Sequence, residues 1–569
     1  MFIASPAARA PRRSRRPEAP ALGLLRVAYA IAACLGSSAL HAQPRDGAKP
    51  DVLSNPSAVY SVPLTSEPTY LKSFTDPTFG TKLMRIARDP GASTSPVSGT
   101  WGTDSRHHYS KDQPWSADGV FYCLENRGGG SPSPLLLDGH TFAPLLSVPS
   151  SAGLWDYRWH PAKARARLMI NVNSSGTELS WVDATTGLKA RTWTLPFAVS
   201  GFGSGEGNAS RDGRFVALAS ASRLVVVDMD PQQPYAPYPN RRIGPARAID
   251  DCGLASCAID WVCVSASGRY AVVSYEGDFP RVYDIDPNTL ALTPHVYPSS
   301  TAACGRDPAK GYILGLGHAD FALDPFDGNA DVLIGQRRSS CPSTGGVVKV
   351  RLRDGAVTSL TDPANEAAPH HISTRNIDRL GWAYVSYYKE SGKRFSDELV
   401  AVKLDGSKAV ERYVHLHSAV SGCYRCEEHG VPSPDGSMIA FASNWAQDCG
   451  TGCGSASVIK DYVVTVGGAV TDAGDAPRPA ATGLALAHIW PNPSSLPLRV
   501  TFALPESGPA RLELVDVAGR SVLAQALGAP GAGLHDATFG AGASLRPGTY
   551  WLRLSQGGGR TASRVVILE

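Results

Sequence analysis

Short apolar runs separated by tight turns dominate the hydrophobic pattern of this chain. The clearest run covers residues 437–443, where apolar side chains alternate with small or polar ones directly after the turn Ser433-Pro434-Asp435-Gly436. A Pro-Asp-Gly turn that leads into an alternating strand is typical of antiparallel sheets. No long segment carries the 3.6-residue period of an amphipathic helix. We therefore predict an all-β protein.

The turn at residues 433–436 is the last of seven similar turns, each followed by an apolar strand. The seven turns occupy residues 116–119, 160–163, 210–213, 265–268, 325–328, 378–381 and 433–436. Their spacing averages about 53 residues, within reach of the repeats that build β-propellers. The 569-residue chain also exceeds a single ordinary core. These observations predict a seven-bladed β-propeller over residues 69–466.

A second signature, an apolar strand that ends in aspartate, recurs in the later half of six units. The six aspartates are Asp138, Asp183, Asp228, Asp284, Asp354 and Asp405. The seventh unit lacks a clear copy, and Asp89, behind the strand predicted over residues 82–88, supplies it. We expect this N-terminal strand to close the ring, because closure removes an exposed sheet edge. The repeated turns resemble those of TolB-type and WD-like β-propellers.

The composition changes behind a glycine- and proline-rich linker predicted at residues 467–482. Alternating strands over residues 483–569 predict a small C-terminal β-sandwich. This part resembles the FlgD-like immunoglobulin-type fold and the type IX secretion sorting domain. The resemblance rests on Pro-Asn-Pro at 491–493, Asp-x-x-Gly-Arg at 516–520, Gly-x-Tyr at 548–550 and a basic-then-apolar end. It implies a protein that the outer-membrane secretion machinery carries to the cell surface; an accessory sandwich without a sorting role is the alternative.

The first 42 residues have the features of an export signal. Six arginines precede an apolar run over residues 27–35, and the small residues that follow predict cleavage before Gln43. A lipoprotein processing box that ends at Cys34 is the alternative. The run is too short to span a bilayer permanently, so we expect no transmembrane segment after signal removal. The predicted location is secreted or on the exterior of a bacterial outer membrane, with a further linker at residues 43–68.

Signal removal changes the formal charge from +3 to −2, since it leaves 48 basic and 50 acidic residues. No basic stripe remains that would indicate nucleic acid as a partner. Ten cysteines also remain, and an even number in an exported protein favours disulfides. The plausible pairs are Cys252–Cys257, Cys449–Cys453 and Cys304–Cys341. Cys423 and Cys426 could instead bind zinc together with Cys449 and Cys453.

The candidate functional residues lie just before the repeat turns, where the innermost strands of a propeller converge on one channel mouth. The polar side chains at this position of the repeat, which we call the repeat phase, are His107, His108, Asp112, Asp156, Tyr157, Glu206, Asp260, His318, Asp320, His370, His371, Arg375, Glu427, Glu428 and His429. Imidazoles and carboxylates around one axis would hold a divalent cation. The metal-ligand candidates are His318, Asp320, His371 and His429. The alternative is a set of polar residues that line a water-filled channel.

Histidines in this phase resemble those of secreted propeller polysaccharide lyases, such as the oligogalacturonate and ulvan lyases. His429 is similar in position to a metal-binding histidine of the oligogalacturonate group, whereas Glu427 stands where that group has another histidine. The resemblance implies β-elimination on a uronic acid, in which a cation or Arg375 neutralises the carboxylate.

The catalytic candidates for that reaction are His108, Tyr157 and His371 as proton acceptors, together with Arg375. No stronger catalytic motif competes with this set. The sequence thus predicts an exported propeller that binds a glycan or protein ligand at its channel mouth. A metal-assisted polysaccharide lyase is the alternative function, and a periplasmic TolB-like scaffold is a third.

Overall fold

The computed structural model describes residues 52–230, 242–253, 257–275, 277, 279–337, 345–465, 484–490, 496–531, 533–540 and 542–567. The predicted signal peptide and the linker at residues 467–482 lie outside these ranges. Within them the chain is built from strands and turns, and the helices are 3-10 segments: η1 (Ser150–Ala152), η2 (Lys163–Arg165), η3 (Pro308–Lys310), η4 (Pro325–Asp327) and η5 (Tyr424–Cys426). In the described ranges no helix has the length and apolar character needed to cross a membrane.

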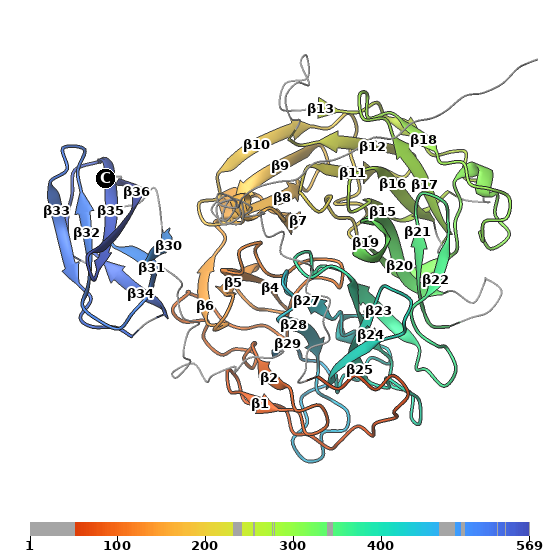
Figure 1. The fold of residues 1–569 in the computed structure, drawn as a ribbon, viewed down its shortest axis with the longest axis horizontal. Helices are drawn as coiled ribbons and strands as arrows, with labels where there is room; N and C mark the ends of the chain where they lie inside the picture. The colour runs from red at the N-terminus through yellow and green to blue at the C-terminus, as the bar shows by residue number, and fades with distance from the viewer. Residues whose placement is uncertain are drawn as a thin grey trace, which may run out of the picture. The chain divides into compact units, whose positions relative to one another are not determined.

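Seven antiparallel blades form the predicted β-propeller (Figure 1). Blade 1 contains β3 (Asp104–Arg106), β4 (Phe121–Arg127), β5 (Leu135–Asp138) and β6 (Pro144–Ser147). Blade 2 contains β7 (Asp156–Trp159), β8 (Leu168–Val172), β9 (Glu178–Asp183) and β10 (Lys189–Thr194). Blade 3 contains β11 (Phe215–Ala219), β12 (Arg223–Asp228), β13 (Arg242–Ile243) and β14 (Arg247–Ala248). Blade 4 contains β15 (Ile259–Val264), β16 (Tyr270–Tyr275), β17 (Phe279–Ile285) and β18 (Leu292–Pro294).

The remaining blades follow in chain order until the last one takes strands from the start of the chain. Blade 5 contains β19 (Leu316–Asp324), β20 (Ala330–Arg337), β21 (Val347–Arg351) and β22 (Val357–Ser359). Blade 6 contains β23 (Pro369–Ser373), β24 (Trp382–Tyr387), β25 (Glu398–Lys403) and β26 (Val410–His415). Blade 7 contains β27 (Val431–Pro432), β28 (Met438–Ser443), β29 (Ile459–Thr465), β2 (Lys82–Arg85) and β1 (Phe74–Thr75). The core lies between neighbouring blades: Ile334 of blade 5, for example, packs in one cluster with Val385 and Val400 of blade 6.

Hydrogen bonds within the repeated turn explain why its sequence recurs. In blade 7 the Ser433 hydroxyl donates to Asp435 Oδ1 (2.7 Å) and accepts from the backbone N–H of Met438 (3.0 Å). Gly436 has a φ of 65°, a left-handed conformation that glycine adopts without strain. The same serine–aspartate pair closes the turns of blade 1 and blade 3. A short polar motif therefore sets the direction in which each apolar strand leaves the turn.

The strand-ending aspartates act as a second set of turn caps. Asp138 Oδ1 accepts the backbone N–H groups of His140 (3.0 Å) and Thr141 (2.7 Å). In the fourth unit the predicted residue is not the cap, because Asp286 accepts the following N–H groups. The predicted Asp284 contacts His295 Nδ1 instead (3.0 Å).

The N-terminal strand closes the ring as predicted. β2 pairs antiparallel with β29, with Leu83 opposite Val464, and both side chains are buried. β29 also pairs in parallel with β3, which joins blade 7 to blade 1 in one continuous nine-stranded sheet. Figure 1 shows β1 and β2, in red, beside the blue-green strands from the end of the propeller.

Residues 52–68, most of the first predicted linker, run along blades 6 and 7. The backbone N–H of Arg412 donates to Leu53 O (2.9 Å), and Trp445 Nε1 donates to Thr65 O (2.8 Å). The N–H of Thr65 donates to Asp448 O (2.8 Å). This segment is therefore held by hydrogen bonds to the propeller.

The C-terminal strands form the predicted β-sandwich. One sheet contains β30 (Ala485–Trp490), β31 (Leu498–Leu504) and β34 (Gly533–Phe539). The other contains β33 (Ser521–Ala526), β32 (Ala510–Val515), β35 (Gly548–Gln556) and β36 (Gly559–Ile567). Alternate side chains such as Leu552 and Leu554 enter a core shared with Phe502. The Pro-Asn-Pro segment at 491–493 lies outside the described residues.

Three disulfides are present in the described ranges. Cys252–Cys257 and Cys449–Cys453 pair as predicted. Cys423 bonds to Cys426, which excludes the four-thiolate zinc site that was the alternative for these residues. Cys304 is also disulfide-bonded, and its predicted partner Cys341 lies outside the described residues.

His415 in β26 is a buried imidazole whose ring nitrogens have no hydrogen-bond partner among the described residues. Burial, with smaller contributions from the charges of His417 and Arg412, lowers its pKa from 6.5 to about 3. Protonation therefore favours the unfolded chain. The stability that His415 contributes is complete above pH 6.5 and is lost as the pH falls toward 3. The loss amounts to about 2 kcal/mol at about pH 5.

Replacing His415 by leucine should remove this contribution to acid sensitivity. Between neutral pH and about pH 5, the free energy of unfolding of the variant should fall by about 2 kcal/mol less than that of the wild type. Urea denaturation at both pH values measures the difference. The control is His140→Leu, a change at an exposed imidazole. Identical pH dependence of wild type and His415→Leu would show that this residue does not cause the loss.

Candidate metal centre

Blades 5, 6 and 7 bring histidines together from or just before their innermost strands, two of which are irregular. The β19–β20 register shifts between Gly317 and Asp320, and the β23–β24 register shifts between Pro369 and His371. His318 and His429 have φ values of 45° and 46°, which non-glycine residues seldom adopt. Bulges and left-handed residues redirect side chains, and they are frequent beside functional sites.

His371 lies at the centre of the resulting cluster. Its ring centroid is 4.2 Å from that of His370, 4.4 Å from that of His318 and 3.9 Å from that of His429. Tyr109 closes one side, with its ring 4.6 Å from His429 and its hydroxyl 3.2 Å from His318 Nδ1. The structure thus brings together three of the four predicted metal-ligand residues, and adds His370.

Glu427 supplies a carboxylate to the same cluster. Its Oε2 lies 3.0 Å from His371 Nε2 and 3.9 Å from His429 Nε2, and its Oε1 lies 3.5 Å from His370 Nε2. One ligand atom from each of His370, His371 and Glu427 falls within 4.8 Å of the other two. Two imidazoles and one carboxylate are a donor set suited to Zn²⁺, Mn²⁺ and related cations, and a three-ligand site leaves coordination positions open.

A second glutamate orients His370. Glu428 Oε2 lies 3.0 Å from His370 Nδ1, so that the other ring nitrogen faces Glu427. Tyr388 stacks on the same imidazole at a centroid distance of 3.7 Å. A carboxylate on the outer nitrogen of a histidine is the usual support of a metal ligand, because it fixes the tautomer and the ring orientation.

Buried nitrogens without partners are the clearest sign that this cluster takes a ligand. Among the described residues, His371 Nδ1 and both ring nitrogens of His429 have no hydrogen-bond partner, although both side chains are fully buried. Buried polar atoms are almost always satisfied, and each exception calls for an explanation such as an ion.

The surroundings of the cluster favour neutral side chains at His371 and His429, and two glutamates lie beside His370. Burial, followed by the neighbouring imidazoles, lowers the pKa of His371 and of His429 well below 6.5. Burial also opposes protonation of His370, but hydrogen bonds to Glu427 and Glu428 outweigh it and raise the pKa of His370 to about 9. Positive charge is therefore stabilised beside the glutamates, where a cation would displace the proton of His370, while His371 and His429 keep their lone pairs, as metal binding requires.

The structure places the other predicted site residues elsewhere. Asp320 is buried, and its carboxylate forms an ion pair with the Arg375 guanidinium (Oδ1 to Nη2, 2.6 Å). His108 contacts Asp112, and it lines a small cavity with Tyr157 and Arg158. None of the cluster histidines at positions 318, 371 and 429 belongs to the described lining of that cavity. Burial raises the pKa of Tyr157 well above 10, which disfavours the phenolate that a tyrosine base requires.

His370, Glu427 and Glu428 were absent from the metal-ligand set predicted from the sequence. A sequence signal for them exists, since paired histidines at 370–371 and the run Glu427-Glu428-His429 occupy the same repeat phase. The choice between neighbours depended on the strand irregularities, which the pattern of apolar residues does not reveal.

Comparison with known proteins found no matching family model and no matching curated protein. Solved structures do match. An oligogalacturonate lyase in complex with manganese is 12% identical with a TM-score of 0.41, and the match covers 71% of this chain and 98% of that one. The Cps50 (Swd1) β-propeller domain of Myceliophteria thermophila is 12% identical with a TM-score of 0.34, covering 63% and 98%. A chain of the mitotic checkpoint complex is 12% identical with a TM-score of 0.34, covering 66% and 96%. These likenesses concern the fold alone.

Proposed function

We propose that this chain binds a divalent cation through His370, His371 and Glu427, and uses it to hold a carboxylate-bearing glycan at the channel mouth. The observation that carries the proposal is the set of fully buried, unpartnered imidazole nitrogens of His371 and His429 beside Glu427. His429 is the candidate for a fourth ligand. An acidic sugar fits the open positions of such a site, because carboxylate oxygens bind divalent cations directly.

Elimination of the bound uronate is the second candidate function, and the position of His318 favours it. Its ring lies at the partly exposed edge of the cluster, 4.4 Å from the ring of His371 and in contact with the Tyr109 hydroxyl. An imidazole there could take the C5 proton of a uronate while the C4–O bond breaks. The products would be a C4=C5 double bond and a leaving group whose oxygen gains a proton.

We further propose that the chain is exported and that its C-terminal sandwich engages the outer-membrane secretion machinery. The three disulfides support an oxidising compartment. The basic and apolar N-terminal stretch and the sorting-domain resemblance supply the rest of the argument.

The proposed function is tested by titrating the full chain, stripped with a chelator, with Mn²⁺ or Zn²⁺ in a calorimeter. We expect one cation per propeller. Polygalacturonate should then bind only to the cation-loaded protein, whereas an uncharged glucan should not bind. Formation of unsaturated uronides, followed by absorbance, distinguishes elimination from binding. Absence of cation binding, or equal polygalacturonate binding in the presence of chelator, would refute the proposal.

A further inference from the structure

The loop that precedes Glu427 is closed by a disulfide. Cys423 directly precedes η5 and Cys426 is its last residue, and Cys426 is completely buried while Cys423 is half-buried. The N–H of Cys426 donates to Cys423 O (3.0 Å), and the N–H of Glu427 donates to Tyr424 O (3.3 Å). The bond therefore ties a single tight turn directly to the residue that carries the cluster's carboxylate.

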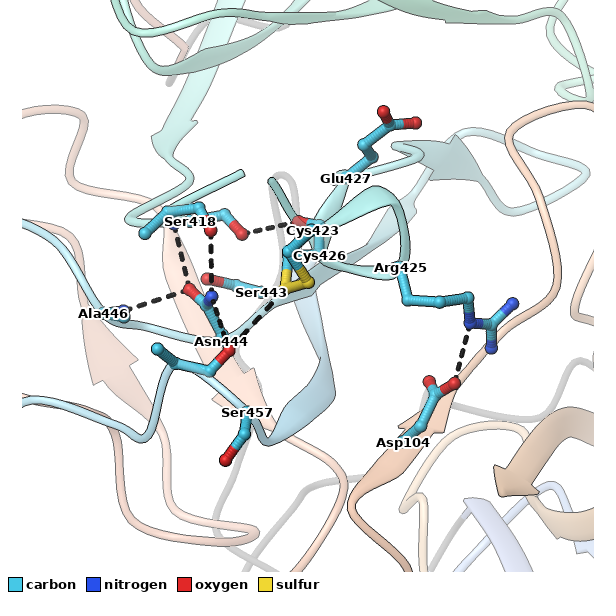
Figure 2. Close-up of a disulfide and its surroundings, with 12 residues drawn as sticks. Asp104, Ser418, Cys423, Arg425, Cys426, Glu427, Ser443, Asn444, Ala446 and Ser457 are labelled. Atoms are coloured by element: carbon cyan, nitrogen blue, oxygen red, sulfur yellow. Dashed lines mark hydrogen bonds and ion pairs between the residues drawn. A yellow bond between two sulfur atoms is a disulfide. The ribbon is translucent and has the colours of Figure 1, made fainter. Parts of the chain in front are cut away.

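Side chains from other parts of the propeller hold this loop on both sides. Arg425 reaches blade 1, where its Nε donates to Asp104 Oδ2 (2.7 Å) and its Nη2 donates to Glu125 Oε2 (3.1 Å). From the segment that precedes the loop, the Ser418 hydroxyl donates to Cys426 O (2.6 Å). Figure 2 shows Arg425 extending from the loop toward Asp104, while Glu427 leaves it in a different direction.

We propose that the Cys423–Cys426 disulfide and Arg425 position Glu427 as a metal ligand, so that cation affinity depends on the oxidised loop. This inference rests on the proposed function. Cys426 packs against Ala442 and Ile459 in a small buried cluster. Without the bond, this packing and the hydrogen bonds of the turn would restrain the loop less, and Glu427 would lose more conformational entropy on binding the cation. The cation would then bind tightly only after the disulfide has formed, which couples metal loading to an oxidising compartment.

The oxidation itself is an ordinary thiol–disulfide exchange. Cys423 and Cys426 lose two electrons and two protons in forming their S–S bond, and the disulfide of an oxidising dithiol/disulfide partner is reduced to two thiols. Outside the cytoplasm such partners maintain oxidised cysteines.

The test is a double-mutant cycle on cation affinity in the full chain. Cys423→Ser/Cys426→Ser should weaken Mn²⁺ binding about 10- to 100-fold, the usual cost of losing support for a metal ligand. In a Glu427→Gln background the same change should have little further effect, because the ligand that the loop positions is already gone. The matched control is Cys252→Ser/Cys257→Ser, which removes another short-loop disulfide and should leave the affinity unchanged.

Arg425 offers an independent variant and a check on folding. Arg425→Met should weaken Mn²⁺ binding, with Arg425→Lys intermediate, and it decides the question if the double serine variant does not fold. In the electron paramagnetic resonance of bound Mn²⁺, both loop variants should resemble Glu427→Gln. Wild-type affinity in the loop variants, or equal losses with and without Glu427, would overturn the inference while leaving the metal site intact. Failure of the wild type to bind any cation would overturn both proposals.

Discussion

Replacing His371 by alanine is expected to lower the affinity for the divalent cation by about 100- to 1,000-fold, the share of one ligand in a several-ligand site. The residue combines complete burial, a pKa held well below its usual value and a ring nitrogen 3.0 Å from Glu427. It also contacts every other imidazole of the cluster that we describe. Isothermal titration with Mn²⁺ measures the loss.

The control for this result is His295→Gln. His295 also lies beside a carboxylate, but it is only partly buried and its nitrogens face Asp284 and Arg353 O in an outer strand region. Its replacement should leave Mn²⁺ affinity within about twofold. If His371→Ala binds Mn²⁺ as tightly as His295→Gln does, the cluster is not the cation site.

The propeller was predictable from the sequence because its determinants are local. The Ser433–Asp435 hydrogen bond, the N–H of Met438 and the left-handed Gly436 lie within six residues of one another. Repetition of such a unit then predicts the ring, and the missing aspartate of the seventh unit predicted closure by the N-terminal strand. The cap at Asp286 was misplaced by two residues because β17 continues through Asp284 to Ile285, and the apolar pattern does not mark that end of the strand.

The clustering of histidines was predictable from the sequence, but the full set of residues in the cluster was not. Repeat phase brought His318, His371 and His429 together, since the same point of each innermost strand faces the channel. It also selected Asp320, but the bulge beside it turns that carboxylate toward Arg375. The alternation of apolar residues carries no signal for a bulge or for a left-handed histidine. The short spacing of Cys252–Cys257 and Cys449–Cys453 predicted two disulfides correctly, whereas the choice between a disulfide and a zinc site at Cys423 and Cys426 was left open by the sequence.

His108 shows a related limit. It shares the repeat phase of the cluster histidines, but blade 1 enters the channel differently: β3 pairs with the far end of β4, and Trp115 forms a separate bridge to Tyr122. The chain between these two points carries His108 toward Asp112 rather than toward His371. Lys111, from the same stretch, forms an ion pair with Glu206 (Nζ to Oε2, 2.7 Å). An equal position in the sequence repeat therefore did not produce an equal position in space for blade 1.

Replacing Asp461 by alanine is expected to destabilise the propeller by about 3–5 kcal/mol, because this buried carboxylate joins the two blades at which the ring closes. Its Oδ2 accepts the His107 backbone N–H (2.6 Å) and the Tyr122 hydroxyl (2.6 Å), and its Oδ1 lies 2.8 Å from His107 Nδ1. Alanine would leave those buried donors without an acceptor, and each such loss costs about 1–3 kcal/mol.

Urea denaturation in the presence of a chelator measures the free energy of unfolding without a contribution from bound cation. Asp461→Asn, which keeps one acceptor oxygen, should lose about half as much, and Asp118→Ala at an exposed repeat turn should cost only about 1 kcal/mol. A loss for Asp461→Ala no larger than that of Asp118→Ala would mean that the backbone pairing of β29 with β2 and β3 closes the ring without this carboxylate.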